Sequence, residues 1–184
     1  MQRVMIVGGP GSGKTTLAKA MAERVPLPLW HIDQIIWEPN WVERDETERM
    51  RELFRIQMYQ RWIIEGCYAP TMTERVARAD TLIFLDLSVW QRIARVSWRV
   101  LQHGGKPRPE MPDGCVERFD RNYVEFLDYI WRTRDGLREK MARFIEEPPA
   151  HLTVHHLQSA GEVRRFLADL EQPNQVAIGA VRSA

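Results

Sequence analysis

The stretch Gly8-Gly-Pro-Gly-Ser-Gly-Lys-Thr15 decides how the rest of this sequence is interpreted. It fits the pattern G-x-x-x-x-G-K-[ST], with Gly8, Gly13, Lys14 and Thr15 at the defining positions. Glycines let successive backbone N–H groups turn toward one small anion without a side chain in the way. The Lys14 ammonium can reach the β- and γ-phosphates of a nucleotide, and the Thr15 hydroxyl can bind Mg²⁺. The stretch therefore predicts a phosphate-binding loop for ATP and Mg²⁺.

The residues on either side of this stretch have the pattern that such a loop requires. Residues 3–7 are a short apolar run typical of a strand, and Leu17, Met21 and Val25 recur at helical spacing over residues 15–25. A plain glycine-rich turn between a strand and a helix is the alternative, and the complete motif in this context makes it the weaker one. The predicted nucleotide contacts come from Gly8, Gly9, Pro10, Gly11, Ser12, Gly13, Lys14, Thr15 and Thr16.

Length and composition limit the class of protein. The chain has 184 residues, 44 % hydrophobic and 28 % charged, which is typical of a globular protein with a full core. Its formal net charge of +1 gives no overall field that would attract nucleic acid or membrane. No apolar run approaches the roughly 18 residues of a membrane span, and the strand pattern that begins at residue 3 leads us to expect no secretory signal. Cys67 and Cys115 have neither disulfide-framework nor zinc spacing. We expect a cytoplasmic protein.

The rest of the chain alternates strands and helices. Further strands are predicted at residues 27–32, 61–64, 81–85 and 151–157, and helices at 46–60, 74–79, 89–101, 119–144 and after residue 159. Residues 37–45 are expected to form a loop. Residues 103–114 are so rich in glycine and proline that they predict either a mobile lid or a plain surface loop. We expect an α/β fold in three layers, one domain over residues 1–172 with a five-stranded parallel sheet, and a loose tail over residues 173–184.

Acidic residues follow three of the predicted strands. Asp33, Glu65 and Asp86 come after the second, third and fourth strands, at the edge of the sheet where the phosphate loop also lies. Phosphates repel carboxylates, so Mg²⁺ or a substrate hydroxyl is needed to explain them. We assign Glu65, with Thr15, to Mg²⁺ through a bound water, and Asp33 to orienting the acceptor. Strand-end caps or surface acids are the alternative for each.

The same residues carry a family resemblance. The phosphate loop resembles the opening of adenylate kinase and related nucleoside-monophosphate kinases. Together with Trp30-His-Ile-Asp33, the Trp37–Trp41 loop and Ile63-Ile-Glu-Gly66, it is similar to the FlaR-type "DNA topology modulation" proteins, which are adenylate-kinase-related ATPases. The resemblance extends to about Leu170. It implies a P-loop NTPase fold with strand order 2-3-1-4-5, a monophosphate-binding region over about 33–60 and a lid at about 100–125.

The resemblance also implies further site residues. Arg95 and Arg99, by their spacing from Asp86, match the arginines at the start of the adenylate kinase lid. Arg132, with Arg134 and Arg138 as other candidates, would supply a lid arginine from the returning helix. The backbone around Ser159 would meet the adenine. The third strand ends in Glu65-Gly-Cys-Tyr-Ala69 where adenylate kinases have Asp-Gly-Phe-Pro-Arg, so the resemblance implies ATP as donor but not AMP as acceptor.

Two functions remain open from the sequence. The first is a Mg-ATP-dependent phosphotransferase acting on a nucleotide or another small-molecule acceptor, with Lys14, Asp33, Arg95, Arg99 and Arg132 as catalytic residues. The second is a nucleotide-dependent regulatory ATPase associated with DNA topology, in which a stripe of Arg92, Arg95 and Arg99 would contact DNA phosphates. The low net charge and the lack of a helix-turn-helix pattern favour the first.

Overall fold

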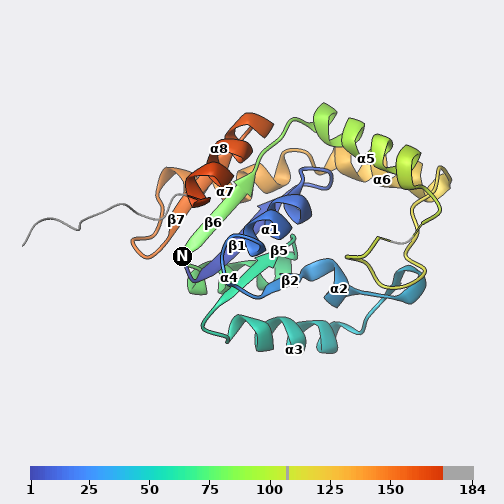
Figure 1. Ribbon diagram of the computed structural model, residues 1–184. Helices are drawn as coiled ribbons and strands as arrows, with labels where there is room; N and C mark the ends of the chain where they lie inside the picture. Colours follow the sequence, from blue (N-terminus) through green and yellow to red (C-terminus); the bar gives the residue numbers. More distant parts are fainter. Residues whose placement is uncertain (107, 172–184) are drawn as a thin grey trace, which may run out of the picture.

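The fold is built around a parallel sheet whose central strand leads into the phosphate loop (Figure 1). The computed structural model describes residues 1–106 and 108–171. The sheet has the order β2-β5-β1-β6-β7, and every neighbouring pair is parallel. In chain order this is the predicted 2-3-1-4-5 arrangement, so the predicted fold class is confirmed. The strands are β1 (Arg3–Gly8), β2 (Leu29–His31), β5 (Trp62–Glu65), β6 (Thr81–Leu85) and β7 (Thr153–Leu157).

Helices cover both faces of the sheet and form an arm at one end (Figure 1). They are α1 (Lys14–Ala22), α2 (Ile32–Ile36), α3 (Glu46–Gln57), α4 (Met72–Arg78), α5 (Val89–His103), α6 (Arg121–Arg132), α7 (Gly136–Glu146) and α8 (Ala160–Glu171). Helices α1 and α8 pack on one face, α3, α4 and α7 pack on the other, and α5 and α6 pack on each other. Among the described residues, no helix is long and apolar enough to span a membrane.

The alternation of side chains along β1 divides the core into two halves. Val4 and Ile6 face one cluster with Leu17 of α1 and Phe166 of α8. Met5 and Val7 face the other cluster, which α3, α4 and α7 supply. Each of these four β1 side chains is fully buried. Both halves are apolar because a central parallel strand is covered on both faces, which holds the end of β1, and so the phosphate loop, rigidly.

The region after β2 is more ordered than the sequence predicts. Residues 32–36 form the short helix α2, because Ile32 and Ile35 point into the core. The expected loop over 37–45 contains a small antiparallel hairpin, β3 (Trp37–Glu38) and β4 (Val42–Glu43), joined by a 3-10 turn over Pro39–Trp41. Helix α3 ends at Gln57 rather than 60. The helical stretch predicted over 119–144 is broken into α6 and α7.

The predicted lid region contains the end of α5 and an irregular segment that returns toward the hairpin (Figure 1). The backbone N–H of Asn40 donates to the carbonyl of Asp113 at 3.1 Å, and Trp41 Nε1 donates to the carbonyl of Val116 at 3.3 Å. Lys19 of α1 forms an ion pair with Glu110. The segment is therefore tied to both α1 and the hairpin. The predicted tail, 173–184, lies outside the described residues, so the domain division stays a prediction.

Candidate active site

The phosphate loop connects β1 to α1 in a tight turn that only glycine fits at key positions. Gly11 and Gly13 have φ angles of 76° and 94°, in the left-handed region that favours glycine. A Cβ atom on Gly8 would stand 2.5 Å from Ser12 Oγ and 2.8 Å from the carbonyl oxygen of Leu85. These three glycines are therefore required by the turn itself.

Polar groups of the loop are placed where they could bind phosphate. Helix α1 begins at Lys14, and the residue before it, Gly13, contributes no side-chain cap. The first N–H groups of the helix therefore remain available to an anion. Ser12 Oγ is buried and has no hydrogen-bond partner among the described residues. Lys14 Nζ lies 3.3 Å from the carbonyl oxygen of Gly9, so its side chain folds back along the loop. These donors fit a bound polyphosphate.

Three residues from separate elements meet at Glu65, the last residue of β5. The Thr15 hydroxyl donates to Glu65 Oε1 at 3.1 Å, and His31 Nδ1 lies 2.7 Å from the same oxygen. The Glu65 side chain is 4 % exposed. Burial by itself would raise the pKa of Glu65, but the hydrogen bond with His31 and the charge of Lys14 together hold that pKa below its ordinary value. Glu65 is thus an ionised acceptor beside the loop.

The Thr15 hydroxyl and the Glu65 carboxylate fit Mg²⁺. No group of three or more histidine, cysteine, aspartate or glutamate side chains suited to a metal occurs in the described part of the chain. Mg²⁺ does not need one, because it is usually held by one or two protein oxygens, substrate phosphates and water. Thr15 and Glu65 could supply those oxygens next to the loop. When bound there, Mg²⁺ would neutralise charge on the β- and γ-phosphates.

A buried arginine hydrogen-bonds to the backbone of the loop that follows Glu65. Arg75 of α4 is fully buried and donates to the carbonyls of Gly66 and Tyr68 at 3.2 and 2.9 Å. Burial lowers the pKa of its guanidinium to about 10. Cys67 in the same loop is exposed, and its Sγ lies 3.4 Å from the backbone nitrogen of Gly8. The turn after β5 is therefore packed directly against the start of the phosphate loop.

Asp33 lies in the first turn of α2, among the charged groups of the site. Its side chain is exposed, and the charges acting on it include those of Lys14, Glu65 and Arg108. Loss of solvation raises the pKa of the Asp33 carboxyl, Lys14 opposes that rise, and Glu65 adds to it. Asp33 is thus an accessible carboxyl with a raised pKa, on which the charge of Lys14 acts.

Two of the predicted lid arginines lie on the side of α5 that faces the loop and the lid segment. Arg95 Nη1 donates to the carbonyl of Ser12 at 3.1 Å, so it contacts the phosphate loop directly. Arg99 forms a two-pronged pair with Glu117, at 2.8 and 2.6 Å. The same carboxylate pairs with Arg108 at 3.2 Å. Glu117 therefore holds two arginines of the lid region next to one another.

In the described part of the chain, the other predicted arginines form no hydrogen bond to the phosphate loop, although Arg134 and Arg138 line a small cavity together with Gly9 of that loop. Arg132 pairs with Asp128 on the exposed face of α6, and its side chain is 75 % exposed. Arg138 of α7 donates to both carboxylate oxygens of Asp86, at 2.9 to 3.2 Å, and His156 also contacts Asp86 at 3.0 Å. Asp86 therefore joins β6 to α7 and β7, and it does not contact Thr15 as Glu65 does.

The arginine stripe proposed for DNA is not a continuous surface. Arg92 is 4 % exposed, and Arg99 is engaged by Glu117. The expectation that Arg92 lies on a solvent-facing stripe is wrong, because the first turn of α5 packs that side chain against the loop.

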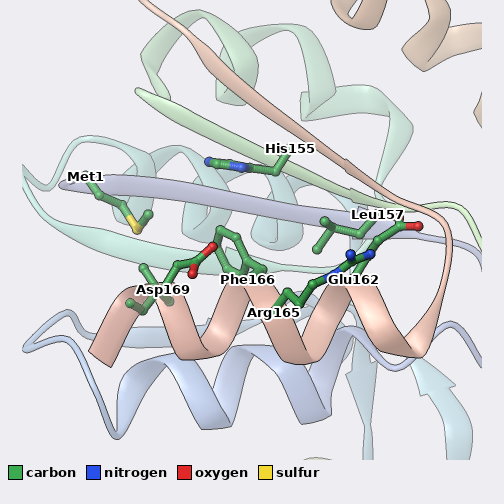
Figure 2. Close-up of a pocket in the computed structure, with 8 residues that line it drawn as sticks. Met1, His155, Leu157, Glu162, Arg165, Phe166 and Asp169 are labelled. Atoms are coloured by element: carbon green, nitrogen blue, oxygen red, sulfur yellow. The ribbon is translucent and has the colours of Figure 1, made fainter. Parts of the chain in front are cut away.

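The region predicted to meet adenine is a helix start. Ser159 Oγ accepts from the backbone N–H of Glu162 at 3.2 Å, and the Glu162 carboxylate accepts from the backbone N–H of Gln158 at 2.7 Å. Figure 2 shows a pocket of about 430 Å³ just beyond it, between β7 and α8, lined by Met1, His155, Leu157, Glu162, Arg165, Phe166, Asp169 and Leu170. No residue of the phosphate loop lines that pocket. The candidate active site is therefore defined by the hydrogen-bond donors and charged groups around the loop, and not by this pocket.

Two comparisons with known protein sequences found similarity over part of the chain. Residues 4–64 match the family model described as ATPase family associated with various cellular activities (AAA). An uncharacterized protein of Bacillus subtilis, YqaC, is 24 % identical over 106 residues, which span 56 % of this chain and 60 % of the relative's length.

Solved kinase structures superpose over most of the chain. Shikimate kinase from Bacteroides thetaiotaomicron gives a TM-score of 0.53 at 22 % identity, covering 92 % of this chain and 96 % of that one. Shikimate kinase from Acinetobacter baumannii, in complex with shikimate, gives 0.55 at 17 %, and a gluconokinase from Sinorhizobium meliloti gives 0.51 at 16 %; each covers 92 % of this chain and 91 % of the other. At such identities the likeness shows the fold alone, an α/β fold with a five-stranded parallel sheet.

The sequence analysis gave three residues that the structure brings to this region no role in the nucleotide site. His31 precedes Asp33 by two positions, so the strand that delivers one delivers the other. Arg108 lies in the segment rich in glycine and proline, where no helical spacing could place it. Arg92 was assigned to the wrong side of α5. Only His31 had a signal in the sequence, namely its position at the end of a predicted strand.

Proposed function

We propose that this chain is a Mg-ATP-dependent phosphotransferase that acts on a small hydroxylated acceptor. The observation that carries the proposal is the position of Asp33, an accessible carboxyl close to Lys14 and Glu65. A nucleotide-binding site needs no such carboxyl, because it repels phosphate. A kinase needs one to receive a proton from the acceptor. The likeness to shikimate kinase and gluconokinase structures supports this class of reaction.

The chemistry assigns one task to each group. The acceptor hydroxyl oxygen forms a bond to the γ-phosphorus, the bond from that phosphorus to the β,γ-bridging oxygen breaks, and ADP leaves. Asp33 orients the hydroxyl and takes its proton, and the raised pKa of Asp33 makes it a better base near neutral pH than an ordinary aspartate. The loop amides and Lys14 hold the phosphates in position.

We assign Arg95, Arg99 and Arg108 to stabilising the negative charge of the phosphoryl group during its transfer. Arg95 contacts the loop, and the charge of Arg108 acts on both Asp33 and Glu65. Burial lowers the pKa of Arg108, and Glu117 opposes that change, so Arg108 remains a partly desolvated cation beside the reacting groups. Arg132, which pairs with Asp128 on α6, is the weaker candidate for this task.

The finer resemblance, to the FlaR-type DNA topology modulation proteins, identifies no acceptor. It stays a prediction based on the phosphate loop and the segments Trp30–Asp33, Trp37–Trp41 and Ile63–Gly66. The buried Arg92 and the paired Arg99 remove the main support for a DNA-binding surface on α5.

Transfer and simple ATP consumption are distinguished by an acceptor panel. ADP release and phosphorylated product are measured with Mg-ATP and a set of sugar acids, cyclic polyols, nucleosides and nucleoside monophosphates. We expect one class to give product at a rate well above ATP hydrolysis alone. Asp33→Asn should lower that transfer by about 10²- to 10⁴-fold while leaving ATP affinity within about threefold, because Asp33 serves the acceptor.

The matched control is Asp169→Asn, an exposed acid on α8 far along the chain from the loop. It should transfer phosphate at the wild-type rate. If no acceptor of the panel raised ADP release above that with water alone, or if Asp33→Asn transferred as fast as the wild type, the phosphotransferase proposal would be wrong.

A further inference from the structure

Arg92 occupies an unusual place, directly behind the phosphate loop. Its guanidinium rests against Gly9, at the point where a Cβ atom would lie if that residue were not glycine. Its carbonyl oxygen stands 2.5 Å from the corresponding point on Gly11. The residue is 4 % exposed. The first turn of α5 therefore packs one arginine directly against the phosphate loop at Gly9 and Gly11.

The charge of this arginine has little compensation from the protein. Nε of Arg92 has no hydrogen-bond partner among the described residues. The carboxylate whose charge acts on it most strongly belongs to Asp86, and that group already accepts three contacts from Arg138 and has one with His156. The space between them is a cavity of about 10 Å³, room for about one water molecule.

Such an arrangement is costly in a protein without ligand. Burial lowers the pKa of Arg92, with Asp86 opposing the shift and Arg138 adding to it, although a guanidinium stays charged at neutral pH. A buried charge without a full partner destabilises the fold, and an apolar side chain of similar size would be tolerated better. The position therefore needs another explanation than folding stability.

We propose that Arg92 is a positioning residue for the nucleotide's phosphates: its buried positive charge acts through the thin backbone of the loop at Gly9 and is compensated when polyphosphate binds on the other side. It does not touch the nucleotide. This inference rests on the proposed nucleotide-binding function of the loop. Under this proposal, the buried guanidinium of Arg92 is a second positive charge acting on the phosphates that Lys14 would contact directly. The same packing explains why residue 9 is glycine, because a Cβ atom there would overlap the guanidinium.

The test compares dissociation constants for Mg-ATP, Mg-ADP and AMP by calorimetry in wild type, Arg92→Met and Arg92→Lys. We expect Arg92→Met to weaken ATP binding by about tenfold, ADP binding less and AMP binding hardly at all, because the loss scales with ligand charge. Arg92→Lys keeps the charge and should retain most of the ATP affinity. A purely structural role would weaken all three ligands alike and would not be rescued by lysine.

Salt concentration and a control variant separate a buried charge from a surface one. The tenfold loss in Arg92→Met should persist between low and high salt, because a buried charge is poorly screened. Arg121→Met removes an exposed arginine that pairs with Glu125 on α6, and we expect it to bind ATP within about twofold of wild type. Thermal unfolding without nucleotide should show Arg92→Met to be at least as stable as wild type.

The binding measurements distinguish failure of this inference from failure of the proposed function. Equal ATP affinity in wild type and Arg92→Met, or equal losses for ATP and AMP, would overturn this inference and leave the proposed function standing. A wild-type protein that binds neither ATP nor ADP would overturn the proposed function and this inference together.

Discussion

At the scale of single residues, Glu65 organises the site. Its carboxylate accepts from Thr15 of the phosphate loop and contacts His31 of β2, so it connects three elements at one oxygen. The backbone makes this possible because β2 and β1 both pair with β5, in register with Glu65 opposite His31 and Ile6. This geometry and the lowered pKa of Glu65 support the proposal of a magnesium site next to the loop.

Replacing Glu65 tests that site without removing the loop. In the wild type we expect Mg²⁺ to tighten ATP binding, and in Glu65→Gln we expect that gain to fall by about tenfold. Without Mg²⁺ the variant should bind ATP at least as tightly as wild type, since a negative charge near the phosphates is gone. ATP titrations with Mg²⁺ and with EDTA measure both values. Asp86→Asn, at the end of the neighbouring strand, is the control and should keep the wild-type response. An unchanged magnesium gain in Glu65→Gln would exclude Glu65 from the metal site.

The raised pKa of Asp33 makes a second residue-scale prediction, about stability. A carboxyl whose pKa is raised in the folded state favours folding below its ordinary value of 3.8, and that contribution is lost as the pH rises through the raised value. At pH 7 the ionised Asp33 therefore costs stability, and Asp33→Asn should melt about 1–2 °C higher than wild type, a small effect because the side chain is exposed. The difference should vanish near pH 3.5. Melting curves at both pH values check this, and a lower melting temperature for the variant at pH 7 would contradict it.

At the scale of elements, the lid segment is fastened to the hairpin that follows α2. Cys115 lies at this junction: it is 1 % exposed, and its Sγ contacts the backbone of Glu38 and Trp41 at 3.4 and 3.3 Å. Gly114 has a φ of 75° and packs against Asn40. The segment is therefore held to the hairpin by a few backbone contacts, which a lid of the proposed kinase would have to break to admit a substrate.

The two cysteines report on these backbone contacts. Cys67 is exposed and Cys115 is buried, so one thiol should react quickly with a chromogenic disulfide reagent and the other slowly. Gly114→Ala forces a side chain against Asn40 and should speed the slow phase by about tenfold. Gly105→Ala is the matched control: Gly105 also has a positive φ, of 83°, but no atom stands within 4 Å of its Cβ position. Equal slow rates in the two variants would show that the hairpin contact does not hold the segment closed.

At the scale of the whole molecule, much of the fold could be predicted because it depends on local patterns. The order of strands and helices follows from hydrophobic spacing, and one motif fixes where β1 ends. The meeting of Thr15 and Glu65 could also be predicted, because parallel strands end at the same edge of the sheet. The helix α2 could not, since a single turn held by Ile32 and Ile35 depends on the core beneath it.

The positions of Arg108 and Arg92 could not be predicted because both depend on tertiary contacts rather than on local sequence patterns. Arg108 lies in a segment without periodicity, and its position depends on the pair with Glu117. Arg92 was placed by helical spacing alone, which gives the side of a helix but not which side faces the protein. The spacing of charged residues therefore predicts an arginine stripe, while only packing against Gly9 and Gly11 shows that one member is buried.

The central claim of this account is that the turn over Gly8–Thr15 binds the phosphates of ATP. The most direct measurement is a calorimetric titration of Mg-ATP into the wild type and into Lys14→Ala, with circular dichroism to show that both are folded. The account predicts saturable binding at one site in the wild type and a loss of at least about tenfold in the variant, because a charge-assisted contact to phosphate is removed. Equal affinity in two folded proteins would contradict it.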